Sequence, residues 1–331
     1  MLSCAVLDDY QDVARTVADW RPLSGKIDVH MYTDHFSDRE ALADALAGFD
    51  IAVVMRERTP FDRWLFERLP RLKLLVTTGH RNASIDLEAA ADRGVTVCGT
   101  EGSSGSTAEL AWGLILAHMR NIPQEVGRFR DGGKWQTSVG RTMHGKKLGV
   151  IGIGTLGTKV ARVGIAFGMD VSGWSRSLTA ERCAELGIRH AGSLDDLLRA
   201  SDVVTLHVTL NAQSRGLIGG RELGLMRPTA LLINTSRGPV VDERALIDTL
   251  RKRRIAGAGI DVFDQEPLPL DHPYRRLDNL IATPHLGYVT EETYSVFYGQ
   301  AVEDIAAWLA GNPVRILRPG SQPGPGSMAA S

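Results

Sequence analysis

Three side chains with acid–base or anion-binding chemistry follow successive predicted strands in the second half of the chain. Arg237 lies in "LLINTSRGPVVDE", Glu266 in "GAGIDVFDQEPLP" and His285 in "IATPHLGY". Ligands of open α/β sheets bind at the carboxyl ends of the strands, so we expect these side chains to converge on one crevice. There an arginine fork can hold the carboxylate of an α-keto acid, and a histidine whose tautomer a glutamate fixes can transfer the proton at the alcohol.

Each of these residues alone has a plainer interpretation. His285 follows Thr-Pro and could be only a turn residue, and Arg237 precedes Gly-Pro and could merely hold a loop. The joint placement at three strand ends is what favours catalysis.

A glycine fingerprint precedes this set. In "KLGVIGIGTLGTKVARV", Gly152, Gly154 and Gly157 form G-x-G-x-x-G directly after an apolar strand, with Thr155 and Leu156 inside the motif. The first glycine allows a tight turn, the second a close approach to a pyrophosphate, and the third close packing of helix on strand. The helix N-terminus then offers N–H groups and a favourable dipole to the phosphates. This stretch predicts a dinucleotide site.

The next predicted strand ends in "GWSRS", without the carboxylate that usually binds the ribose of NAD. Ser175, Arg176 and Ser177 stand there instead, and together they can accept a 2′-phosphate through charge-assisted hydrogen bonds. We therefore expect NADP(H) to be favoured over NAD(H). The alternatives are that Arg176 is a solvated loop residue or stacks on the adenine of either cofactor.

Strand-like and helix-like segments alternate along the chain, which is typical of parallel α/β architecture. Five strands are predicted in the first hundred residues, at 3–7, 28–32, 51–55, 72–77 and 95–98. A long helix at 106–119 follows, and then six strands at 147–151, 170–174, 203–207, 230–234, 257–262 and 280–282. A last helix at 291–309 has no sheet of its own, so we expect it to pack on the first domain, which makes the second domain an insertion.

Bulk composition limits the function classes. The 331 residues include 38 Lys plus Arg and 39 Asp plus Glu, a balance that argues against a dedicated nucleic-acid binder. The cysteines Cys4, Cys98 and Cys183 lack metal-ligand spacing, so we expect no metal and reduced thiols in the cytoplasm. No apolar run approaches the roughly 20 residues needed to cross a bilayer. The Pro- and Gly-rich stretch 318–331 is predicted to be a disordered tail.

The motifs together resemble the D-isomer-specific 2-hydroxyacid dehydrogenase family, from about residue 51 to 317. The matching segments are "LGVIGIGTLG", "LMRPTALLINTSRGPVVDE", "AGAGIDVFDQEPLP" and "TPHLGYVTEET". The resemblance implies a flavodoxin-like substrate domain (1–102 and 286–317) interrupted by an NAD(P)-binding Rossmann domain (103–285). It also implies hydride transfer between nicotinamide C4 and substrate C2, with Arg237 binding the keto acid, His285 as acid and base, and Glu266 as its partner.

Further site residues are implied by the same resemblance. Asp261 would position the nicotinamide carboxamide, and His207, Thr235 and Gly287 would also contact the cofactor. "TTGHRNASID" resembles a loop whose N–H groups hold the substrate carboxylate, centred on Gly79 and followed by His80. "MRERTPF" resembles a stretch that can project an arginine at the substrate, which makes Arg56 and Arg58 candidates. The alternative for these two is a solvated pair on either side of Glu57.

Within the family, "GWSRS" is similar to the glyoxylate and hydroxypyruvate reductase branch, whereas "LHVTL" has Thr209 where a proline is frequent. A 3-phosphoglycerate dehydrogenase is the alternative enzyme. A non-catalytic nucleotide-sensing protein, as in the corepressor branch, is the alternative class. The expected partners are a small 2-keto or 2-hydroxy acid and, from the resemblance, a second copy of the chain that binds partly through residues 108–141.

Overall fold

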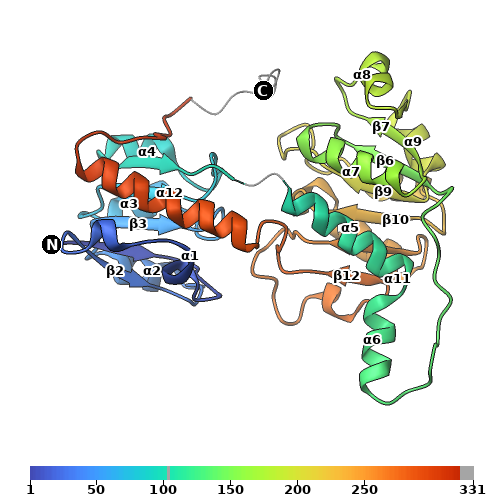
Figure 1. The fold of residues 1–331 in the computed structure, drawn as a ribbon, viewed down its shortest axis with the longest axis horizontal. Helices are drawn as coiled ribbons and strands as arrows, with labels where there is room; N and C mark the ends of the chain where they lie inside the picture. The colour runs from blue at the N-terminus through green and yellow to red at the C-terminus, as the bar shows by residue number, and fades with distance from the viewer. Residues whose placement is uncertain (103–104, 321–331) are drawn as a thin grey trace. The chain divides into compact units, whose positions relative to one another are not determined.

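The fold consists of two α/β units (Figure 1), seen in a computed structural model that describes residues 1–102 and 105–320. One unit contains residues 1–102 and 290–320, and the other contains 105–289. Each is built on a parallel sheet. The predicted fold class, an α/β unit interrupted by an inserted Rossmann-like unit, is confirmed. Residues 286–289, expected in the first domain, lie in the second unit, and residues 321–331 of the predicted tail lie outside the described residues.

The first unit has the strand order β2-β1-β3-β4-β5, which is the flavodoxin-like order. Its strands are β1 (Leu2–Val6), β2 (Ile27–Met31), β3 (Ile51–Val54), β4 (Leu74–Thr77) and β5 (Thr96–Gly99). All four residues of β3 and of β4 are buried, as expected for parallel strands covered on both faces. The chain order reverses between β1 and β3, where such sheets bind ligands.

Helices cover this sheet on both faces. They are α1 (Ala14–Val17), η1 (Arg21–Leu23), α2 (Arg39–Leu46), α3 (Arg63–Arg68), α4 (Leu87–Asp92) and α12 (Glu291–Leu309). The side chains of Asp38, Asp62 and Asp86 accept hydrogen bonds from backbone N–H groups at the starts of α2, α3 and α4. Helix α12 buries Phe297 and Tyr298 against this unit and contacts β4 and α1, so the last helix packs where the sequence predicted.

The second unit has the strand order β12-β11-β10-β9-β6-β7-β8, the doubly wound Rossmann order with one more strand at the β12 edge. The sheet contains β6 (Lys147–Ile151), β7 (Asp170–Trp174), β8 (Arg189–His190), β9 (Val203–Leu206), β10 (Leu231–Asn234), β11 (Gly257–Ile260) and β12 (Leu280–Ala282). The sequence predicted six of these strands. The seventh, β8, has two exposed residues at the sheet edge and hence no apolar pattern to detect.

Two layers of helices bury the faces of this second sheet. They are α5 (Ser106–Met119), α6 (Ile122–Arg130), α7 (Thr155–Ala166), α8 (Ala180–Glu185), α9 (Leu194–Ala200), α10 (Gly220–Leu225), and α11 (Glu243–Arg251), with the short helices η2 (Gly238–Val240) and η3 (Pro273–Arg276). One core packs side chains of α9, α10 and α11 on the sheet, and a second core packs α5 and α7 on it. None of the described helices is long and apolar enough to cross a membrane.

Candidate active site

The glycine fingerprint forms a tight strand-to-helix turn between β6 and α7. Gly152 has φ +94°, and a Cβ there would lie 2.5 Å from the carbonyl oxygen of His207. A Cβ at Gly157 would overlap the carbonyl oxygen of Gly152, so the helix packs on the turn through bare backbone. Gly154 is the N-cap of α7 and has no side-chain cap, and a Cβ there would meet no described atom beyond its own helix within 4 Å. The start of α7 is therefore open to an anion.

Two polar atoms beside this turn support a dinucleotide site. Within the described residues, the buried atoms Nδ1 of His207 and Oγ1 of Thr235 have no hydrogen-bond partner. His207 follows β9, which pairs with β6, and Thr235 follows β10, the next strand beyond β9. Burial lowers the pKa of His207 to about 4, so its ring is neutral at pH 7. Unsatisfied buried polar atoms at the switch point of a Rossmann sheet fit a polar ligand such as a dinucleotide.

The arginine of the predicted catalytic set lies in a turn that Asn234 organises. The Asn234 side chain accepts from the N–H of Ser236 at 3.0 Å and donates to the carbonyl of Arg237 at 3.0 Å. The Ser236 hydroxyl donates to the carbonyl of Leu206 at 2.6 Å, which ties the turn to β9. Sequence reasoning did not identify Asn234 as a site residue, although its place in "INTSRG" is a frequent start for an Asx turn.

Glu266 bridges the backbone and the histidine. Its Oε1 accepts from the N–H of Phe263 at 2.9 Å, and its Oε2 lies 2.6 Å from Nδ1 of His285. A carboxylate is an acceptor only, so the Nδ1 proton points at Glu266 and Nε2 is the ring atom that can exchange a proton with a substrate. The side chain of His285 is 21% exposed and that of Glu266 is 30% exposed. The structure thus brings Glu266 and His285 together as predicted, in the same unit as Arg237.

The loops that carry these residues are packed directly on one another. A Cβ at Gly238 would overlap the backbone of Phe263, so the Arg237 turn contacts the Glu266 loop through backbone atoms. Asp261 is 1% exposed and accepts from the Thr283 hydroxyl at 2.6 Å and from the N–H groups of Leu286 and Gly287 at 2.7 and 2.8 Å. Burial raises its pKa, and these hydrogen bonds act against that rise. Asp261 therefore holds the turn in which His285 adopts φ +53°.

The candidate 2′-phosphate residues follow β7. Ser175 is half-buried, and Arg176 and Ser177 are exposed. The Arg176 guanidinium donates to Oε1 of Gln213 at 2.7 Å and also to the Gln213 carbonyl. The side chain is therefore held against the loop after β9, which is a contact that sequence reasoning did not foresee because Gln213 lies 37 positions away.

Apart from Arg237, the predicted substrate residues lie in the first unit, just after the ends of β3 and β4. Gly79 has φ +90°, and its N–H donates to the Thr100 hydroxyl at 2.8 Å, so this N–H is engaged within the protein. A methyl group at Gly79 would overlap the Arg56 guanidinium, which therefore lies directly over this loop. Arg58 instead donates to the carbonyl of Asp8 at 2.7 Å. Desolvation and the charges of Arg81 and Arg56 lower the pKa of the exposed His80.

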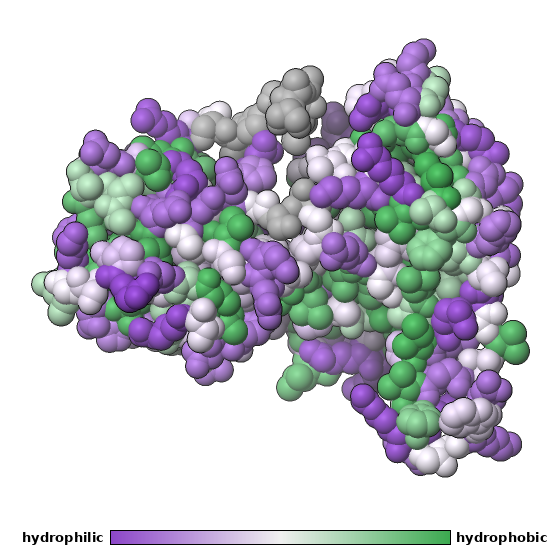
Figure 2. All heavy atoms as spheres, in the orientation of Figure 1, coloured by the Kyte–Doolittle hydropathy of each residue, from purple (hydrophilic) through white to green (hydrophobic). Residues whose placement is uncertain are grey.

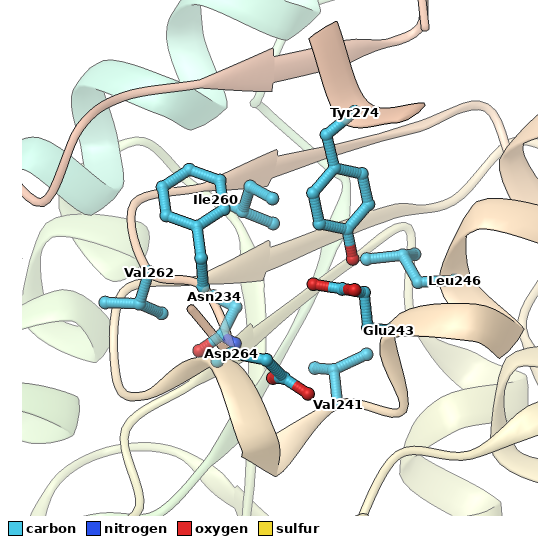
Figure 3. Close-up of a pocket in the computed structure, with 10 residues that line it drawn as sticks. Asn234, Val241, Glu243, Leu246, Ile260, Val262, Asp264 and Tyr274 are labelled. Atoms are coloured by element: carbon cyan, nitrogen blue, oxygen red, sulfur yellow. The ribbon is translucent and has the colours of Figure 1, made fainter. Parts of the chain in front are cut away.

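A small pocket lies beside the Arg237 turn, between it and the chain segment 262–264 (Figure 3). Its walls include the carboxylates of Glu243 and Asp264 and the hydroxyl of Tyr274, which points towards Glu243. Burial and the neighbouring Glu243 raise the pKa of Asp264. Arg237, Glu266 and His285 do not line this acidic pocket. Among the described residues no group of His, Cys, Asp and Glu is arranged to hold a metal ion.

Residues 112–287 match the model of a known family, described as the NAD binding domain of D-isomer specific 2-hydroxyacid dehydrogenases. The chain belongs to this family. A glyoxylate reductase from Aeropyrum pernix is 39% identical over 256 residues, which cover 75% of this chain and 76% of that protein. A solved oxidoreductase from Ralstonia solanacearum has a TM-score of 0.91 and 37% identity, covering 98% of this chain and 99% of the other.

A D-3-phosphoglycerate dehydrogenase from Methanocaldococcus jannaschii is 36% identical over 276 residues, which cover 82% of this dehydrogenase and 52% of that protein. Our chain thus spans about half the length of that relative. The family, the oxidoreductase class and a nicotinamide dinucleotide cofactor, all expected from the motifs, are confirmed.

Proposed function

We propose that this D-2-hydroxyacid dehydrogenase works as a 2-keto acid reductase in which Arg237, Glu266 and His285 are the catalytic residues. The observation that carries the proposal is the 2.6 Å contact between Glu266 and Nδ1 of His285, which leaves Nε2 for the substrate. Arg237 follows the neighbouring strand and supplies a cation for the substrate carboxylate.

Each protein group has a separate task in the proposed reaction. The nicotinamide dinucleotide supplies the reducing equivalent when bound, at the start of α7 and beside His207, Thr235, Asp261 and Gly287. Arg237 holds and polarises the 2-keto acid. His285 Nε2 gives a proton to the carbonyl oxygen in reduction and takes it back in oxidation, while Glu266 keeps the ring oriented. Alignment and charge stabilisation are thus the work of the protein.

A kcat/KM panel tests this function against its alternatives. Glyoxylate, hydroxypyruvate, its 3-phosphate and longer 2-keto acids are each supplied with NADPH and with NADH. A phosphorylated substrate that outperforms all others would favour a phosphoglycerate dehydrogenase, for which the Arg56 guanidinium over Gly79 could serve as the phosphate partner. Tight cofactor binding without turnover on any substrate would contradict the reductase and favour a nucleotide sensor.

The proposed cofactor preference is NADP(H) over NAD(H). Ser175 brings no negative charge to the end of β7, and Arg176 is fixed nearby by Gln213. A carboxylate would repel a 2′-phosphate, so Ser175→Asp should shift selectivity towards NADH. Equal NADPH-to-NADH ratios of kcat/KM in this variant and the wild type would refute the assignment. Ser193→Asp, at the N-cap of α9 in the same unit, controls for the added charge.

The proposed assembly is a homodimer through α6 and the segment after it. Helix α6 has no buried residue, and Ile122, Val126, Phe129, Trp135 and Val139 are all more than 40% exposed. Figure 2 shows apolar residues on the surface of this part of the second unit. Light scattering tests the dimer: Phe129→Asp should yield monomers, and a variant that stays dimeric would exclude this surface.

The proposed location is the cytoplasm. The three cysteines are free and buried, as expected for a protein in a reducing compartment.

A further inference from the structure

A buried polar network occupies the carboxyl ends of β1 and β3, at the switch point of the first unit. At its centre is Asp8, which is 2% exposed and has φ +57°. Its Oδ1 lies 3.0 Å from Nδ1 of His35 and accepts from the Tyr10 hydroxyl at 3.2 Å, and its Oδ2 accepts from the Thr59 hydroxyl at 2.6 Å. A carboxylate with this many partners fixes the loop around it in one conformation.

The network reaches across to the loop that follows β3. Arg58 donates to the carbonyl of Asp8 at 2.7 Å, and its guanidinium lies 4.2 Å from the centre of the Tyr10 ring. Thr59 is bound to the Asp8 carboxylate, so two successive residues of this loop are anchored to the loop after β1. Arg58 therefore holds the loop in place. From the sequence, Arg56 and Arg58 were equal candidates for a substrate contact.

The anchored loop presents Arg56 in a conformation that it would not adopt without support. Arg56 has φ +53°, a strained region for a side chain with a Cβ. Its N–H donates to the Thr78 hydroxyl at 2.9 Å, and its carbonyl accepts from the Asn82 side chain at 2.6 Å. These bonds hold the backbone from the β4 side, and the Asp8 network holds it from the β1 side. The guanidinium then lies over Gly79.

We propose that Asp8, Arg58 and Thr59 are positioning residues that place Arg56 for recognition of the substrate anion. The inference rests on the proposed function, because it takes the loop of Gly79 and Arg56 as a contact of the 2-keto acid in addition to Arg237. A guanidinium fork recognises an anion only in a defined orientation, so a mobile Arg56 would lose affinity although its charge remains. The network thereby tunes the KM for the substrate and leaves the cofactor site in the other unit unaffected.

The test is a double-mutant cycle on the full chain. Arg58→Met keeps the apolar stem and removes the guanidinium, Arg56→Met removes the proposed anion contact, and the double variant combines them. We expect Arg58→Met to raise the KM for glyoxylate or hydroxypyruvate by about tenfold, the effect of losing one hydrogen bond to a charged group, with kcat within about twofold. Arg15→Met is the matched control, because Arg15 also donates to a backbone carbonyl, that of Val29 at 2.8 Å, on the exposed surface of the same unit.

The two substitutions should be non-additive if Arg58 acts through Arg56. The double variant should then have the KM of Arg56→Met alone, since no oriented guanidinium remains to be misplaced. Additive effects, or a wild-type KM in Arg58→Met, would overturn the proposal. A general loss of folding would lower the thermal midpoint and kcat together, and Tyr10→Phe, which removes a single bond to Asp8, gives a milder second variant whose KM should also rise. A wild-type enzyme without turnover would instead reject the proposed function.

Discussion

Replacing Glu266 by Gln tests the proposed proton transfer through the geometry of one side chain. The wild-type carboxylate has two acceptor oxygens, one on the Phe263 N–H and one on His285 Nδ1. Glutamine keeps the size and retains a single acceptor oxygen. If that oxygen stays on the Phe263 N–H, the amide NH2 faces Nδ1, and the neutral ring must carry its proton on Nε2. A second proton, at Nδ1, would then face the amide NH2 of the new glutamine, which is itself a donor and cannot accept it.

The contacts of Glu266 give the size of the effect. Losing a hydrogen bond to a charged group costs about 1.5 to 3 kcal/mol, and leaving a donor unsatisfied adds about 1 to 3 kcal/mol. Because the two side chains are 21% and 30% exposed, water relieves part of this cost. We therefore take the lower ends, about 2.5 kcal/mol, which corresponds to nearly a 10²-fold loss in kcat.

The assay is steady-state reduction of the best 2-keto acid, with the cofactor dissociation constant measured by fluorescence. Glu266→Gln should lose kcat and keep its cofactor affinity. Glu243→Gln is the matched control, because Glu243 lies 3.1 Å from Nε2 of His272 in the same unit and should leave kcat unchanged. A Glu266→Gln enzyme with more than half of the wild-type kcat would refute the reasoning. Nitrogen-15 spectra of the histidine rings report the tautomer independently.

Three further predictions follow from other parts of the structure. His285→Ala should lower kcat by about 10²- to 10⁴-fold with unchanged cofactor affinity, and an active variant would remove His285 from proton transfer. Gly152→Ala should destabilise the protein by about 2 kcal/mol and weaken NADPH binding, because φ is +94° and the new Cβ meets a backbone oxygen; calorimetry showing wild-type affinity would contradict this. Burial raises the pKa of Asp304 to about 7 against an ordinary 3.8, so the folded state keeps a proton that the unfolded state loses. The free energy of unfolding should therefore fall as pH rises from about 4 to 7, by roughly 2 kcal/mol after allowance for screening, and Asp304→Asn should remove this slope in urea titrations.

The strands and the long helices could be predicted because the order of apolar and polar residues within each segment indicates which residues are buried. The four-residue strands β3, β4, β9 and β10 are buried throughout, and each lies in a short, mostly apolar run that predicts a strand. Helix α12 could be assigned to the first unit because an amphipathic helix without a neighbouring strand needs another sheet to cover it. Neither inference needs knowledge of distant contacts.

Helix α6 was not predicted, because the proline near its start also fits the end of the preceding helix. Asn121 precedes α6 in the left-handed region at φ +53°, so the chain turns and starts a second helix at Ile122, just after the helix predicted at 106–119. Proline at the second position of a helix is well tolerated, and it marks a beginning here. A Pro near a predicted helix end thus has two meanings, and only tertiary structure distinguishes them.

The site shows a similar division between reactive groups and their supports. Arg237, Glu266 and His285 could be proposed as a set because each follows a predicted strand and their chemistry is complementary. The support roles could not be predicted, and the sequence names Arg58 and Asp261 only as candidate substrate and cofactor contacts. Asp8 is 50 positions from Arg58, and Asp261 acts on backbone N–H groups that any residue could supply. Hydrogen bonds to backbone leave no signature in the partner's residue type.

These supports join the three loops of the second unit that carry the proposed catalytic residues. The N–H of Asp261 donates to the carbonyl of Asn234 at 3.0 Å, the Asp261 carboxylate holds the Thr283–Gly287 turn, and Gly238 packs on the backbone of Phe263. A substitution that shifts the backbone of one loop should therefore also shift the backbone of the other two. Substitutions of these supports should lower kcat without additivity, because each of them displaces the same Glu266–His285 pair relative to Arg237.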